Sequence, residues 1–185
     1  MIRLALLLVL IIFIITLILR GIKIVLSGEV MIIERLGAYL STLREGMSFI
    51  IPIIDAPRAI PWQFLEKDKN GNIYCVVKNI DRIPLRENIF YLLKHPIFKE
   101  DHSKIELDVL VYFIIEDPCM ATYNVASLPK AFEKIIISAL KNKSTEDEIL
   151  QGYYSEVQNK LLETLCEEAK KFGVKINKVE LENIK

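Results

Sequence analysis

Near its amino terminus the chain carries sixteen consecutive uncharged residues, Leu4 to Leu19, and almost all of them are Leu, Ile, Val or Phe. As an α-helix with a rise of 1.5 Å per residue, this run is about 24 Å long, a little shorter than the ~30 Å hydrocarbon core of a bilayer. Arg3 and Arg20 flank the run, and their long side chains can extend outward and lengthen the apolar span. The run therefore predicts a membrane anchor, which either spans the bilayer or enters it from one side.

Two alternatives to a membrane anchor are weaker. A cleaved signal peptide needs small residues at a cleavage site after the apolar run, and here Arg20-Gly21-Ile22-Lys23 follows instead. A buried core helix is rarely apolar on every face. We therefore expect a single-pass N-terminal transmembrane helix within residues 1–26. The domain at 27–185 is expected in the cytoplasm, because more basic residues follow the run than precede it.

The composition limits what the rest of the chain can do. The 24 basic and 24 acidic residues cancel, and they form no basic stripe of the kind that binding to phosphates needs. Nucleic acid is therefore not expected as a partner. The three cysteines, Cys75, Cys119 and Cys166, are odd in number and widely spaced, which predicts reduced and buried thiols rather than a disulfide framework.

Several segments have the pattern of β-strands joined by tight turns. Glu29 to Leu36 is rich in β-branched residues, and Asn70-Gly71 is a typical hairpin turn. Ile105 to Ile115 alternates with period two, which places its odd-numbered residues on the core side. Further strands are predicted at Arg82 to Asn88 and at Val174 to Ile184.

The helices are indicated by their capping residues. Asp117 before Pro118 predicts an N-cap, and Ser127 predicts the cap of a second helix. The residues expected to be buried along this second helix are Leu128, Ala131, Phe132, Ile135, Ala139 and Leu140. Thr145-x-x-Glu148 has the pattern of a capping box. A last helix is predicted from about Tyr153 to Phe172, ending before Gly173. Together these elements predict an α+β fold with an antiparallel sheet packed against helices.

A second apolar segment, Met47 to Ile54, contains Pro52, which favours an edge strand or a loop in contact with the membrane. Tryptophan is enriched at the level of the lipid headgroups, so Trp62 is a further candidate contact. For Trp62, a half-buried position in the core is an equally good interpretation. The residues expected to touch the bilayer are Leu4, Leu8, Ile12, Ile15 and Leu19 on the anchor, and Phe49, Ile50, Ile51 and Trp62 after it.

The sequence shows no pattern of a catalytic, cofactor or metal site. It has only two histidines, His95 and His102, and it lacks the H-x-x-x-H, C-x-x-C and G-x-S-x-G motifs and a glycine-rich phosphate loop. Cys119, at the start of a helix, could have a lowered pKa, although an inert thiol is the more common case. The pairs Asp55–Arg58 and Arg82–Glu87 are expected to be structural ion pairs. We therefore predict that the protein is not an enzyme and needs no cofactor.

Three segments of the chain carry a recognisable family pattern. The first is Glu34-Arg35-Leu36-Gly37-Ala38-Tyr39, continued by Thr42 to Met47 and by Phe49-Ile50-Ile51-Pro52 with Asp55. The second runs from Asp117 to Val125, and the third is the closing strand from Gly173. Together these segments resemble the SPFH or band 7 family, which includes stomatins, prohibitins and flotillins. The resemblance covers nearly the whole chain and implies a band 7 domain behind an N-terminal membrane segment.

The resemblance also implies a function. Such proteins are scaffolds that form homo-oligomers on membranes, organise microdomains, and modulate partner membrane proteins such as proteases or channels. Two departures from the family pattern stand out: the polar stretch Lys141 to Glu148, and the absence of a C-terminal coiled coil after the closing strand. The alternatives are therefore a regulatory subunit of a membrane protease, or a truncated band 7 fragment that does not assemble.

Overall fold

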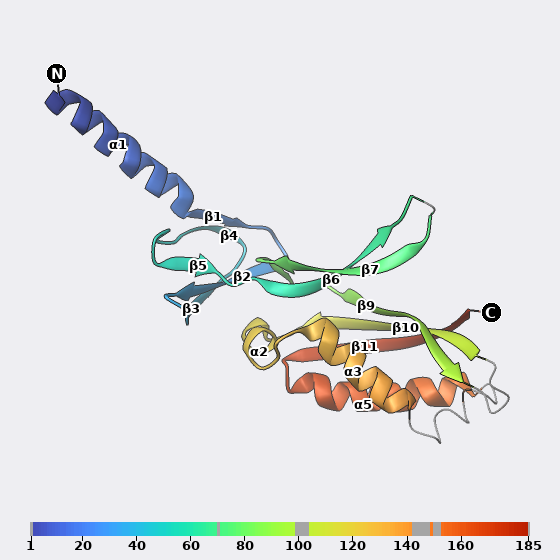
Figure 1. Ribbon diagram of the computed structural model, residues 1–185. Coiled ribbons are helices and arrows are strands. Elements are labelled where there is room, and N and C mark those ends of the chain that lie inside the picture. The colour runs from blue at the N-terminus through green and yellow to red at the C-terminus, as the bar shows by residue number, and fades with distance from the viewer. Residues whose placement is uncertain (1, 70, 99–103, 142–148, 150–152, 185) are drawn as a thin grey trace. The chain divides into compact units, whose positions relative to one another are not determined.

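A computed structural model describes residues 2–69, 71–98, 104–141, 149 and 153–184 of the chain. The strand pairs β1–β4, β2–β3, β2–β5, β6–β7, β9–β10 and β10–β11 are all antiparallel. The chain also contains α-helices, before and between the strands in sequence (Figure 1). The predicted α+β class is therefore confirmed, although the strands form several small sheets instead of one.

The chain divides into two compact units. The first consists of Met1–Ala59 and Asp81–Ile83, and the second of Ile60–Ile80 and Pro84–Lys185. The predicted division into an anchor at 1–26 and a domain at 27–185 remains a prediction.

The first unit holds a helix followed by short strands around a small apolar core. Val25, Met31, Ile33 and Ile50 form this core, with Leu43 packed against it. β2 is the central strand of its sheet, between β3 and β5, which explains why its β-branched residues are buried. The elements are α1 (Ile2–Gly21), β1 (Ile22–Val25), β2 (Glu29–Arg35), β3 (Ala38–Leu43), β4 (Gly46–Phe49), β5 (Asp55–Pro57) and β8 (Ile83–Pro84), whose second residue belongs to the other unit.

The second unit is a three-stranded sheet with helices on one face and a separate β-hairpin. The sheet order is β11-β10-β9, and β6 pairs with β7. Figure 1 shows α3 and α5 side by side below β10 and β11. The elements are β6 (Ile60–Lys67), β7 (Ile73–Ile80), β9 (Asn88–Phe98), β10 (Lys104–Ile115), α2 (Pro118–Tyr123), α3 (Leu128–Leu140), α5 (Tyr154–Lys170) and β11 (Val174–Ile184).

The alternation along β10 builds the core of the second unit. Leu107, Val109, Val111, Phe113 and Ile115 are all buried, as the period of two predicts. The ring of Phe132 from α3 packs edge-on against Phe113, with the ring centroids 5.1 Å apart. On α3 the sequence pattern was only partly correct, because Ile136 is buried while Ile135 and Ala139 are half-buried.

The predicted caps are confirmed for two helices. The Asp117 carboxylate accepts hydrogen bonds from the backbone N–H groups of Cys119 and Met120 at 2.9 and 3.0 Å, with Pro118 as the first residue of α2. The Ser127 hydroxyl caps α3. The capping box at Thr145-x-x-Glu148 lies outside the described residues.

The strand expected at Arg82 to Asn88 is wrong for most of its length. In that range only the two residues of β8 and Asn88, the first residue of the long strand β9, belong to strands. β9 lacks a clean alternation because it contains a bulge at Lys94, whose φ is +54°. The Asp108 carboxylate, almost fully buried, accepts a hydrogen bond from the Lys94 N–H at 2.6 Å. This bond satisfies a donor that the bulge takes out of the ladder.

Candidate membrane-facing surface

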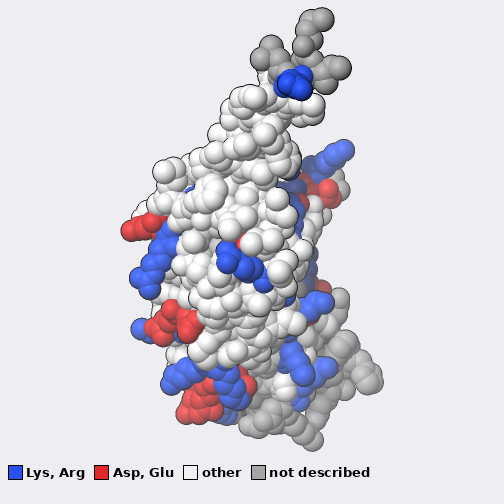
Figure 2. Space-filling model, turned by 90° about the vertical axis from the view of Figure 1, so that its left-hand side faces the viewer, with Lys and Arg blue, Asp and Glu red and all other residues white. Residues whose placement is uncertain are grey.

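Helix α1 exposes apolar side chains in every direction. Every side chain from Leu6 to Ile15 is exposed, and Leu8, Ile12, Ile15 and Leu19 are 49–64% exposed. In Figure 1 the helix extends away from the strands of its own unit, and in Figure 2 it is an almost uncharged column. The side chain of Leu4 lies outside the described residues. Within the described part of the first unit, no packing covers this apolar surface.

None of the helices in the described ranges is long and apolar enough to cross a membrane. The predicted transmembrane span is therefore not confirmed.

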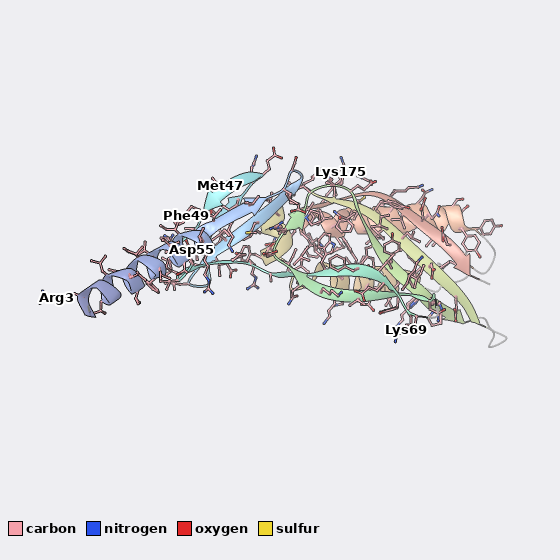
Figure 3. All side chains as sticks on the ribbon, turned by 90° about the horizontal axis from the view of Figure 1, so that it is seen from above. Arg3, Met47, Phe49, Asp55, Lys69 and Lys175 are labelled. Carbon is pink, nitrogen blue, oxygen red and sulfur yellow. The ribbon has the colours of Figure 1, made fainter. Side chains whose placement is uncertain are left out.

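The strands after α1 continue the apolar surface. In the antiparallel pair β1–β4, Ile22 lies opposite Phe49 and Ile24 lies opposite Met47. All four side chains are exposed, whereas Val25 on the other face of β1 is buried. Figure 3 shows Met47 and Phe49 along β4, with Arg3 at the outer end of α1. We call these four residues, Ile22, Ile24, Met47 and Phe49, the apolar ladder. A solvent-facing ribbon normally carries polar residues on such a face.

Two of the expected membrane contacts require correction, because their side chains are buried. Ile50 is 5% exposed and belongs to the core of the first unit, while its backbone N–H donates to the Gly21 carbonyl at 2.8 Å. Trp62 is 8% exposed and packs against Phe113 in the second unit, with ring centroids 5.8 Å apart. The core interpretation of Trp62 is thus the correct one. Phe49 and Ile51 remain exposed.

Gly21, the last residue of α1, lies close to the end of β4. A Cβ atom on Gly21 would lie 2.6 Å from the Ile50 carbonyl oxygen and 2.4 Å from a ring carbon of Phe49. A side chain at this position would therefore push the helix away from the strand. The glycine allows the helix end and β4 to approach closely, which places the base of α1 beside the apolar ladder.

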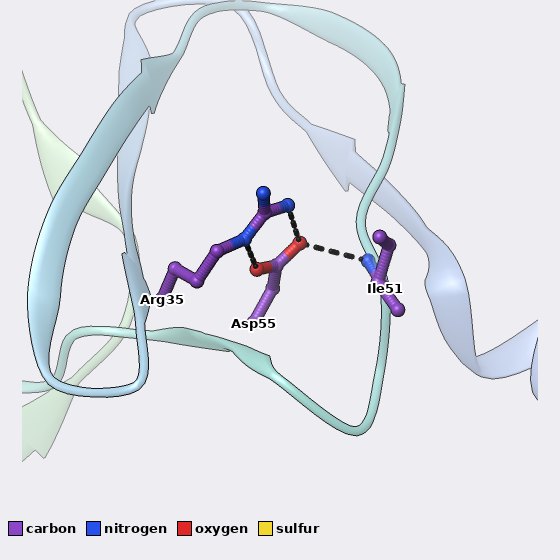
Figure 4. Close-up of polar contacts among 3 residues, drawn as sticks. All are labelled: Arg35, Ile51 and Asp55. Atoms are coloured by element: carbon purple, nitrogen blue, oxygen red, sulfur yellow. Dashed lines mark hydrogen bonds and ion pairs between the residues drawn. The ribbon is translucent and has the colours of Figure 1, made fainter.

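Asp55 fixes the turn that follows β4. Its carboxylate accepts two hydrogen bonds from the Arg35 guanidinium, at 2.7 Å from Nε and 3.1 Å from Nη2. It also accepts a bond from the Ile51 N–H at 3.0 Å (Figure 4). The predicted Asp55–Arg58 pair is wrong, because Arg58 lies near Glu34 instead, at 3.7 Å. Arg35 and Asp55 are direct neighbours across β2 and β5.

The Asp55 contacts should make the turn sensitive to acid. The bonds from Arg35, and then that from Ile51, lower the pKa of Asp55. Because the folded-state pKa is lowered, this stabilisation is present above the usual aspartate pKa of about 3.9 and is lost as the pH falls through the folded value. We expect the protection factor of the Ile51 amide, which is its intrinsic exchange rate divided by its observed rate, to fall severalfold across that range, as measured by hydrogen-exchange mass spectrometry.

Asp55→Asn should remove this pH dependence, because asparagine does not titrate. Glu34→Gln is the matched control, since the Glu34 carboxylate lies beside Arg58, whereas the groups that lower the pKa of Asp55 are Arg35 and Ile51. It should leave the dependence in place. If Asp55→Asn showed the same acid response as the unsubstituted chain, Asp55 would not be its cause.

Exposed apolar residues also occupy the turns of the first unit. Leu36 is 82% exposed and has a φ of +51°, in the left-handed region that leucine rarely adopts. Its N–H donates to the Ile54 carbonyl, which places it next to the turn that carries the exposed Ile51 and Ile53. Sequence reasoning did not name Leu36, Ile22 or Ile24 as membrane contacts, and it included Met47 and Ile53 only as part of the segment Met47 to Ile54. The signal available was a leucine before glycine in a hairpin turn, where asparagine or aspartate is usual.

The cysteines and histidines form no candidate catalytic site within the described residues. All three cysteines are free and half-buried. The suggested lowering of the Cys119 pKa is wrong: burial and the charge of Asp117 raise it. Burial, with the nearby charge of Lys141, lowers the pKa of His95, and His102 lies outside the described residues. In the part of the chain that the structure describes, no three His, Cys, Asp or Glu side chains are placed to hold a metal ion.

The remaining predicted ion pair, Arg82–Glu87, is also replaced. The Glu87 carboxylate accepts a hydrogen bond from the side-chain amide of Asn177 at 2.7 Å, a contact over ninety positions of sequence. This bond connects the segment before β9 to β11 and has a structural role.

Several known proteins are similar to the chain in sequence. An uncharacterized protein of Methanothermobacter thermautotrophicus is 25% identical over 89% of the chain, which matches 45% of that protein. An uncharacterized protein of Mycobacterium tuberculosis is 26% identical over 95% of the chain, matching 41% of that protein. One from Methanocaldococcus jannaschii is 25% identical over 90% of the chain and 73% of its own length. The chain thus spans less than half the length of the first two relatives.

A family model also matches most of the chain. Residues 23–185 match the SPFH domain / Band 7 family. This range contains the Arg35–Asp55 pair and the whole second unit. It also contains every residue of the apolar ladder apart from Ile22. The chain belongs to the SPFH domain / Band 7 family.

Proposed function

We propose that this protein is a membrane-attached scaffold whose helix α1 inserts into the hydrocarbon of a bilayer. The observation that carries the proposal is the exposure of large apolar side chains on every face of α1. A helix satisfies its own backbone hydrogen bonds, so it can enter lipid without leaving polar groups unpaired. Each Leu, Ile, Val or Phe near the centre of a lipid-embedded helix contributes about 0.3–0.6 kcal/mol, so the dozen or so exposed residues of α1 together favour insertion.

The apolar ladder and the exposed turn residues Leu36, Ile51 and Ile53 extend this surface. We propose that they rest at the interface where α1 enters the lipid. Arg3 and Arg20 stand at the two ends of the uncharged run, where their charges can stay with the polar headgroups. The domain after α1 is proposed to lie on the cytoplasmic side.

We further propose that the protein assembles as a homo-oligomer and modulates partner membrane proteins such as proteases or channels. Membership of the SPFH domain / Band 7 family supports a scaffold-like role. Attachment to one bilayer removes much of the entropy cost of meeting a partner, so weak contacts between domains are sufficient. In this mechanism the protein acts by holding its partners close together on the membrane, and no catalytic group takes part.

Flotation of the full chain with phospholipid vesicles tests the attachment. The chain is reconstituted from detergent, washed with high salt to remove electrostatically bound protein, and centrifuged through a density gradient. We expect it to rise with the vesicles. Recovery in the bottom fraction, with Trp62 fluorescence typical of the folded protein, would contradict the proposal.

A further inference from the structure

One long edge of the sheet in the second unit is open. Among the residues described, β11 pairs only with β10, so its other edge presents backbone N–H and C=O groups without a partner strand. β11 runs over eleven residues and has a bulge at Asn177, after which the pairing is regular from Lys178 to Ile184. A long regular edge is a template for pairing with another strand.

The charges along β11 are divided between its two halves. Lys175 and Lys178 lie in the first half, and Glu180 and Glu182 lie in the second. These side chains are on the face opposite the buried Val174, Ile176 and Val179. The Tyr112 hydroxyl donates to the Glu180 carboxylate at 2.8 Å, and Lys178 pairs with the same carboxylate. The charges near the middle of the strand are therefore held in place.

We propose that β11 pairs antiparallel with β11 of a second copy of this chain, around Val179. In this register Lys178 lies opposite the partner's Glu180, and Glu180 lies opposite the partner's Lys178. Opposite charges directly across two strands stabilise the pairing, and the two-fold symmetry uses each contact twice. Parallel pairing would bring like charges together. Lysine on an edge usually prevents association, but here the partner strand brings glutamate to it.

This inference rests on the proposed function, because membrane attachment supplies the effective concentration that such a contact needs. Exposed ion pairs and one pair of edge strands give only modest affinity. Two chains on the same vesicle meet far more often than two chains in solution. We therefore expect the β11 contact to be well populated on vesicles and sparse in dilute detergent.

Disulfide crosslinking tests the register. Full-length Lys178→Cys and Glu180→Cys chains are reconstituted separately or mixed in the same vesicles, and mild oxidation is followed by gel electrophoresis. The mixture should form crosslinked dimers severalfold faster than either variant alone, because residues 178 and 180 face each other only across the two chains. The unsubstituted chain gives the background from Cys75, Cys119 and Cys166. Equal rates in all samples, or no dimer above background, would overturn the proposal.

Charge reversal provides a second measurement, with energy transfer between donor- and acceptor-labelled chains on vesicles. Lys178→Glu or Glu180→Lys alone should reduce association roughly tenfold, because symmetry turns two attractive pairs into two repulsive ones. In the double variant Lys178→Glu/Glu180→Lys, residues 178 and 180 again have opposite charges, both within one chain and across to the partner. This variant should therefore restore association. Lys134→Glu on α3 is the matched control and should have no effect. Failure of the double variant to restore association would overturn the proposal.

Flotation of the same vesicles separates the two proposals. Chains that float but show neither register-specific crosslinking nor charge rescue would overturn the β11 pairing and leave membrane attachment intact. Chains that do not float would overturn membrane attachment, and crosslinking in solution would then test whether β11 pairs without it.

Discussion

Gly173→Ala should lower the free energy of unfolding of the second unit by roughly 2–5 kcal/mol. Gly173 has a φ of +66°, where any residue with a Cβ is strained. A Cβ at this position would also lie 2.7 Å from the Asp117 Cβ and 2.8 Å from the Asp117 carbonyl oxygen. The neighbouring backbone cannot move aside easily, because the N–H groups of Glu116 and Asp117 both donate to the Gly173 carbonyl at 2.9 Å.

The effect can be measured by denaturant unfolding followed by tryptophan fluorescence. Trp62 is the single tryptophan of the chain and is buried in the second unit, so its emission reports on that unit. Gly71→Ala is the matched control, because Gly71 has a φ of +83° but nothing within 4 Å of the added Cβ. It should cost about 1 kcal/mol, from the backbone conformation alone. Equal losses for the two variants would show that the contact with Asp117 contributes nothing.

Replacing Leu8, Ile12 and Ile15 together by Asp should abolish flotation with vesicles. Each aspartate near the centre of a lipid-embedded helix costs about 2.5–3.5 kcal/mol, whereas each Leu, Ile, Val or Phe there contributes only about 0.3–0.6 kcal/mol, so three aspartates outweigh the gain from the remaining apolar residues. All three side chains are exposed, so the fold of both units should be unchanged. Trp62 fluorescence checks this for the second unit.

The matched control places the same three charges elsewhere. Phe64, Val77 and Tyr153 of the second unit are also large, apolar and exposed. Their replacement by Asp should leave flotation intact, since they are not part of the proposed membrane surface. Loss of flotation in both triple variants would mean that general hydrophobicity, and not α1, holds the protein on vesicles.

The elements that could be predicted from sequence are those set by local patterns. The alternation along β10 and the capping by Asp117 and Ser127 depend on neighbouring residues, and the structure confirms them. β9 could not be found in this way, because its bulge at Lys94 depends on Asp108 from the adjacent strand.

The candidate site was predicted less completely because it depends on strand register. From the sequence, Arg58 was expected to pair with Asp55. The antiparallel register of β2 and β5 brings Arg35 there instead. Likewise, the run Met47 to Ile54 is uniformly apolar, and only the pairing of β4 with β1 decides which side chains are exposed. Ile50 is a core residue of the first unit, and its N–H donates to the Gly21 carbonyl at the end of α1, a contact between segments distant in sequence.

Quenching of a tryptophan within α1 by brominated lipids tests most directly whether this helix lies in hydrocarbon. Phe13→Trp is introduced near the middle of the uncharged run in the full chain, and the unsubstituted chain gives the background from Trp62. Insertion predicts strong quenching of the additional emission, with a spectrum shifted to shorter wavelength. Additional emission that is unquenched, at the wavelength of tryptophan in water, would contradict membrane attachment through α1.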